Sequence, residues 1–113
     1  MTATDHAGLV VLTFQECLEL LAETAIGRVA FVSDGDVEVL PVNYTLDGPA
    51  IAFRTADGSK LGAAVQRAAV TFEVDEYDDR EATGWSVGIK GQAEVVTDAE
   101  VLGRLKRSGL RPY

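Results

Sequence analysis

The segment FRTADGSKL, residues 53–61, concentrates residue types that bind anions. An apolar run ends near Arg54 and Thr55, and turn-forming residues then lead into a short helical pattern that begins near Ser59. Amides at the start of a helix lack partners within it, and the helix dipole favours an anion there. Ser59 and Thr55 add hydroxyl donors, while Lys60 and Arg54 add positive charge. The segment predicts either a phosphate site or a capped helix with solvated cations, and it lacks the spacing of a Walker loop.

The overall charge narrows the classes of partner. Eighteen acidic residues against ten basic ones give a formal net charge of −8, which argues against nucleic acid and against an anionic membrane surface. A small anionic ligand remains compatible, because a few local cations can dominate a pocket. Cys17 and His6 are the only residues of their types, so we expect no zinc site and no histidine-dependent triad. A single cysteine is typical of a reducing cytoplasm, where we expect the protein.

Apolar periodicity predicts the elements that must position this segment. The order is helix, three strands, helix, two strands, helix. We expect the helices near residues 13–23, 59–67 and 97–107, and the strands near residues 27–31, 37–44, 50–55, 69–75 and 84–96. This order predicts a mainly β fold with peripheral helices, and five antiparallel strands tend to close into a barrel without exposed edges. Residues 1–12 are predicted to be a flexible tail and residues 13–113 a single domain.

Local signals set expected boundaries. Capping boxes at residues 13–16 and 97–100 predict two helix starts. The acidic stretch at residues 75–81 is predicted to be a solvated loop. Gly88 or Gly91 is expected to mark a bulge or bend in the long last strand. The first eight residues have neither basic residues nor a long apolar run, so we expect no signal peptide and no membrane span.

Five strings in order resemble the FMN-binding split-barrel proteins of the pyridoxamine 5′-phosphate oxidase-like superfamily. They are AIGRVAFV at 25–32, VLPVNY at 39–44, IAFRTADGSKL at 51–61, VTFEVDE at 70–76 and GWSVGIKGQAEVV at 84–96. The chain is most similar to short actinobacterial members, which include nitroimidazole-reductase-like proteins. The resemblance implies an antiparallel split β-barrel that forms a homodimer, with FMN at the interface. Relatives continue with a further strand that often carries a His or Arg near the flavin, so the domain is expected to be truncated at its C-terminus.

The resemblance places one strand along the flavin ring. This ring strand comprises Val39, Leu40, Pro41, Val42 and Asn43. In relatives its main chain bonds the polar edge of the ring, and because Pro41 has no amide, Val42 and Asn43 are expected to make those bonds. Val39, Leu40 and Val42 are equally compatible with barrel core, and they could serve both purposes because a flavin ring needs an apolar wall.

The family's phosphate positions fall on the segment described first. Ser59 and Lys60 match the pair at the helix start, while Phe53 and Arg54 match the pair at the strand end, and Thr55 is an additional donor. Relatives often carry Arg where this chain has Ser59, and Arg54 offsets the missing charge in principle.

Two residues of the last strand are expected to face a flavin across the dimer interface. Ser86 falls on a position that contacts the ring or the ribityl chain in relatives. Trp85 would stack near the flavin, or it is an aromatic residue of the core or of the interface.

The resemblance implies an FMN-dependent oxidoreductase that acts on a small molecule. FMN would perform the hydride or electron transfer, so no side chain need be a general acid or base, and none is assigned. Two alternatives stay open: a module that binds flavin, deazaflavin or haem without turnover, and a barrel that has lost its cofactor. The substrate, the electron donor and the choice between FMN and deazaflavin are left open.

Overall fold

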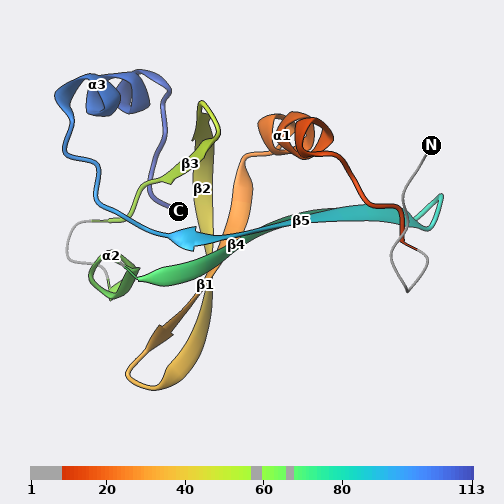
Figure 1. The fold of residues 1–113 in the computed structure, drawn as a ribbon, viewed down its shortest axis with the longest axis horizontal. Coiled ribbons are helices and arrows are strands. Elements are labelled where there is room, and N and C mark those ends of the chain that lie inside the picture. Colours follow the sequence, from red (N-terminus) through yellow and green to blue (C-terminus); the bar gives the residue numbers. More distant parts are fainter. Residues whose placement is uncertain (1–8, 57–59, 66–67) are drawn as a thin grey trace.

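The computed structural model describes residues 9–56, 60–65 and 68–113 of the 113-residue chain (Figure 1). The elements in chain order are α1 (Phe14–Glu23), β1 (Ile26–Ser33), β2 (Asp36–Asp47), β3 (Ala50–Phe53), α2 (Lys60–Val65), β4 (Ala69–Asp78), β5 (Thr83–Gln92) and α3 (Ala99–Arg107). This order confirms the predicted mainly β fold with peripheral helices. None of the described helices is both long and apolar enough to cross a membrane.

The five strands form one antiparallel sheet in the order β3-β2-β1-β4-β5. The β1–β2 and β4–β5 hairpins extend in different directions from the centre of the sheet (Figure 1). In the part of the chain that the structure describes, β3 and β5 pair with each other at no point, so the expected removal of exposed edges is not seen. The reason is geometric: β3 has only four residues and the long hairpins diverge.

The β4–β5 hairpin differs from its predicted boundaries. β4 continues to Asp78, so half of the predicted acidic loop is strand, and pairing runs from Asp75↔Ser86 to Asp78↔Thr83. Backbone pairing prevails there because the acidic side chains stay exposed. β5 ends at Gln92 rather than at residue 96, and residues 93–98 lead to α3.

The sheet has a core face and an outer face, because successive side chains of a strand point to opposite sides. Val29 and Phe31 of β1 are buried on the core face, whereas Arg28 and Val32 lie on the outer face. The core combines side chains of α1, α2 and four strands: Leu21, Val29, Phe31, Val42, Tyr44, Leu61, Val65, Phe72, Val74 and Val87. Among the described residues no polar or charged side chain other than that of Tyr44 is buried.

Gly27 allows a close approach at the centre of this core. A Cβ at this position would lie 2.7 Å from Cε2 of Phe72, so the ring occupies the space of the missing side chain. The ring of Phe72 in turn meets that of Tyr44 edge to face, with centroids 5.0 Å apart. Gly27 of β1 thus leaves room for an aromatic pair between β2 and β4 that a side chain at this position would block.

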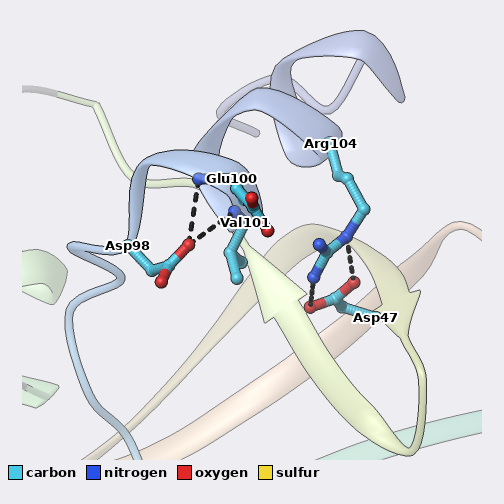
Figure 2. A network of polar contacts seen from close by, with 5 residues as sticks. All are labelled: Asp47, Asp98, Glu100, Val101 and Arg104. Carbon is cyan, nitrogen blue, oxygen red and sulfur yellow. Dashed lines mark hydrogen bonds and ion pairs between the residues drawn. The ribbon is translucent and has the colours of Figure 1, made fainter.

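The two predicted capping boxes have different outcomes. At α1 the box is confirmed, since Thr13 Oγ1 accepts from Glu16 N and Thr13 N donates to Glu16 Oε1. These bonds lower the pKa of Glu16. At α3 the predicted box is wrong, because Asp98 is the N-cap and its Oδ1 accepts from the amides of Glu100 and Val101 (Figure 2). The carboxylate one residue later replaces the expected threonine hydroxyl.

Candidate functional site

One edge of β2 has no strand partner over most of its length. β1 pairs with residues 36–43 of β2, while β3 pairs only with residues 44–47. No other described strand lies against the second edge of residues 36–43. We call this stretch the free edge of β2, and it contains the whole predicted ring strand.

The hydrogen-bond ladder decides which main-chain groups the free edge presents. Tyr44 N donates to Ala25 O, so the polar groups of Tyr44 turn toward β1. In an antiparallel strand these groups alternate between the two neighbours, so Val42 also bonds toward β1. Val39 and Asn43 therefore direct their N–H and C=O groups to the free edge, and Pro41 directs its C=O there. The amide of Asn43 thus faces the free edge, that of Val42 faces β1 instead, and Val39 supplies the second amide of the free edge. Bonds from these amides to a ring stay a prediction.

The side chains of the ring strand divide between the two faces. Val39, Pro41 and Asn43 lie on the outer face, and Val39 is 56% exposed. Leu40 and Val42 lie on the core face, where Val42 is only 1% exposed. The core interpretation is confirmed for Val42 and is wrong for Val39, while contact with a flavin ring stays a prediction.

The structure brings Asn43 and Arg54 together through the end of the β2–β3 ladder. Tyr44 pairs with Phe53, so Asn43 and Arg54 are the next cross-strand neighbours. Both hold the segment that follows α3: Asn43 Nδ2 donates to Arg111 O at 3.2 Å and Arg54 Nη1 donates to Leu110 O at 3.4 Å. No local pattern in the sequence indicates this segment, because its contact with Asn43 joins residues 68 positions apart.

A pocket of about 470 Å³ adjoins Arg54. It lies between β3, α2, residues 94–96 and α3, and its lining includes Phe53, Arg54 and Thr55 of the predicted phosphate site. Its wall is mostly apolar: Ala50, Ile51, Ala52, Val65, Val95, Val96, Val101, Leu102, Leu105 and Leu110. A pocket with an apolar wall and a few polar groups is typical of a small-molecule site.

An ion pair fixes α3 over this pocket. Arg104 donates to both carboxylate oxygens of Asp47, at 3.1 and 3.2 Å (Figure 2). The Asp47 carboxylate raises the pKa of Arg104. Asp47 lines the pocket, and its charge is already neutralised there.

The helix-start half of the predicted phosphate site is only partly within the structure. Ser59 lies outside the described residues, and Lys60 is the first residue of α2, where its side chain is also outside the description. Their roles stay predictions. Of the four predicted phosphate donors, only Arg54 and Thr55 have side chains that the structure describes.

Trp85 and Ser86 lie far from the ring strand of the same chain. β1 and β4 separate β5 from β2, and three strand spacings amount to about 14 Å. Trp85 is half-buried against the core, as one interpretation expected, while Ser86 is exposed on the outer face. A single chain therefore does not bring these two residues to the ring strand.

A charged group that the sequence analysis missed lies beside the ring strand. Arg28, which pairs across strands with Pro41, donates to Glu73 at 3.3 Å and to Asp75 at 3.0 Å. Partial burial and the neighbouring Asp75 raise the pKa of Glu73, and Arg28 opposes them. Arg28 lies 45 residues before Glu73 and 47 residues before Asp75 in the sequence, so no local motif indicates the group.

These features fit a flat heteroaromatic ring with a phosphate tail. The free edge offers main-chain donors and acceptors to a polar ring edge, and Val39 and Pro41 offer an apolar wall. Arg54 and Thr55 lie where the ring strand ends. Among the residues that the structure describes, no group of three or more side chains could hold a metal ion.

The five-stranded antiparallel sheet with short peripheral helices defines the class of this protein as a split β-barrel. Residues 13–113 match the family model described as pyridoxamine 5′-phosphate oxidase, and the chain belongs to this family.

The chain is also similar to two curated relatives and to a solved structure. The uncharacterized protein Rv0080 of Mycobacterium tuberculosis is 35% identical over 104 residues, which cover 88% of this chain and 68% of Rv0080. Rv3129 of the same species is 40% identical over 68 residues, or 60% of each chain. The FAD binding protein from Mycobacterium smegmatis has a TM-score of 0.81 and 36% identity, with 89% of this chain and 82% of that chain covered. The chain thus spans about two thirds of the curated relatives it matches.

Proposed function

We propose that the chain binds the flavin nucleotide FMN and acts as an FMN-dependent oxidoreductase on a small molecule. The free edge of β2 carries this proposal, because it presents main-chain groups beside an apolar outer face where the ring strand is expected. Family membership and the similarity to a protein described as FAD binding support a flavin.

The residues of the chain would bind and orient the cofactor. The main-chain groups of Val39 and Asn43 would bond the polar edge of the ring, and the side chains of Val39 and Pro41 would cover one face of it. Arg54 and Thr55, with the predicted Ser59 and Lys60, would bind the phosphate. The flavin supplies the hydride or electron transfer when bound, so the protein need only hold, orient and tune it.

We further propose that the complete site needs a second copy of the chain. Val32, Val37 and Val39 lie close together on the outer face of the β1–β2 hairpin, and Val37 is 74% exposed. An exposed apolar cluster of this kind marks an interaction surface. A homodimer that places β5 of one copy beside β2 of the other would bring Ser86 to the ring, which one chain does not do.

Equilibrium titration tests cofactor binding. FMN, FAD and riboflavin should each be added to the purified protein while flavin fluorescence is measured, with light scattering to determine the oligomeric state. We expect a dimer that binds FMN. The Arg54→Ala variant should bind FMN about 10- to 100-fold more weakly, the effect expected of one lost charge-assisted bond.

The matched control is Arg80→Ala, which removes the same charge from the exposed β4–β5 turn and should bind as the wild type does. A wild-type protein that binds no flavin would contradict the proposal. A protein that binds FMN but is not reduced by a nicotinamide donor in the presence of an acceptor would instead support a binding module without turnover.

A further inference from the structure

The segment after α3 lies across the end of the β2–β3 ladder, where the side chains of Asn43 and Arg54 bind its backbone carbonyl groups. Asn43 Nδ2 donates to the carbonyl oxygens of Arg111 and Pro112, at 3.2 and 3.4 Å, and Arg54 Nη1 donates to that of Leu110. In all three bonds the segment contributes only a backbone carbonyl as the acceptor. They fix the backbone of Arg111 beside Arg54 while leaving the Arg111 side chain exposed.

The backbone of Arg111 thereby lies beside Arg54. The ion pairs among the described residues use Arg28 and Arg104, and neither Arg54 nor Arg111 takes part in one. Of the two acidic residues that line the adjoining pocket, Asp47 is paired with Arg104, and Glu94 is not among these ion pairs. Two arginines held close together by the backbone, neither in an ion pair among the described residues, favour an anion near both of them.

The position of Arg54 at the end of the ring strand favours one anion, the phosphate of a flavin nucleotide. The free edge of β2 runs from residue 36 to Asn43, and Arg54 is the cross-strand neighbour at its end. A flavin with its ring along residues 39–43 would therefore direct its tail toward Arg54 and the pocket. The tail of FMN ends in a phosphate, whose oxygens can accept from two guanidinium groups at once.

We infer that Arg111 is a phosphate-binding residue of the flavin site and acts together with Arg54. The inference rests on the proposed function, and it adds a cation from the opposite end of the chain to the segment at residues 53–61. The three carbonyl bonds position Arg111, so its contribution requires the segment after α3 to stay attached to Asn43 and Arg54.

Riboflavin provides the decisive comparison, because it has the ring and ribityl chain of FMN but no phosphate. The Arg111→Ala variant should bind FMN about 10- to 100-fold more weakly than the wild type and bind riboflavin unchanged. Arg107→Ala is the matched control: it removes the same charge from the exposed last residue of α3 and should leave both affinities unchanged. Inorganic phosphate should raise the melting temperature of the wild type more than that of Arg111→Ala.

Two results would overturn the inference while leaving the proposed function intact. One is unchanged FMN affinity in Arg111→Ala. The other is an equal loss of FMN and riboflavin affinity, which would show that Arg111 only maintains the local structure. Arg111→Lys separates charge from geometry and should retain part of the FMN affinity. A wild-type protein that binds neither flavin would instead overturn the proposed function, and this inference with it.

Discussion

The two halves of β2 have different surroundings although they form one continuous strand. Residues 42–47 carry only buried or half-buried side chains, and they are covered by α1 on one face and by α3 with its following segment on the other. Residues 36–41 are exposed on both faces and pair on one edge only. Residues 42–47 stabilise the domain. Residues 36–41 contribute apolar surface and backbone groups that no described strand pairs with on the second edge.

The difference teaches where a small domain of this kind keeps its binding capacity. Val39 and Val42 are the same residue type on one strand, but they are 56% and 1% exposed. Hydrophobicity alone therefore does not distinguish a core position from an exposed one. The face of the sheet does, because Val42 lies on the core face and Val39 on the outer face.

The largest expected effect comes from placing the same charge in each half. Val42→Asp would bury an unpaired carboxylate and should cost about 4 kcal/mol or more in the free energy of unfolding. Val39→Asp should change the unfolding of the monomer by about 0.5 kcal/mol or less, yet prevent association. Urea denaturation and light scattering measure the two effects. If Val39→Asp unfolds the monomer, the two halves of β2 do not differ as described.

The next effect concerns the hydroxyl group that ties β2 to α1. Tyr44 Oη donates to Leu21 O at 2.7 Å and contacts Thr24 Oγ1, and burial raises the pKa of Tyr44. Tyr44→Phe should lower the free energy of unfolding by about 1–2 kcal/mol, since the Leu21 carbonyl loses its shorter bond and keeps only the one from Thr24 Oγ1 at 3.4 Å. Tyr77→Phe, at an exposed position of β4, is the control and should change nothing measurable by urea denaturation.

A smaller effect is expected at the ion pair over the covered half. Asp47→Asn should cost about 0.5–1 kcal/mol, because the pair with Arg104 is partly exposed. The loss should shrink at high salt, which screens the charges. A double-mutant cycle with Arg104→Gln measures the coupling. A coupling that does not change between low and high salt would show that the contact is not mainly electrostatic.

The smallest effect is a pH dependence beside the exposed half. The pKa of Glu73 is raised above 4.5 by partial burial and by Asp75, so the protonated form favours the fold. Its contribution is complete below about pH 4.5 and is lost as the pH rises through the raised value. Glu73→Gln should remove this loss, a change of about 1 kcal/mol or less. Glu81→Gln, on the exposed turn, should keep the wild-type profile of melting temperature against pH.

Local patterns in the sequence predicted the elements well. Periodicity and the box at Thr13 depend on neighbouring residues, and the structure confirms the order of the elements and that box. The end of β4 was wrong because backbone pairing across a hairpin outweighs the polarity of Asp75 through Asp78. The start of α3 was wrong by one residue because two adjacent side chains, Thr97 and Asp98, could each serve as the cap.

The candidate site was only partly predictable. Its ring strand and Arg54 lie in contiguous strings, so a sequence can indicate them. The group around Arg28 arises from strand register, and the attachment of residues 110–112 arises from side-chain bonds of Asn43 and Arg54. Both join residues that lie 45 to 69 positions apart. No single sequence contains that information.

The space at Gly27 also restricts how such sequences can diverge. Because the ring of Phe72 fills the volume that a side chain at position 27 would need, position 27 is free to change only after position 72 has changed. A lineage that acquires Ala at position 27 must first accept a smaller residue at position 72, and it then loses the aromatic partner of Tyr44. Mutational order at these two positions is therefore constrained, and Gly27 with Phe72 should be inherited as a pair.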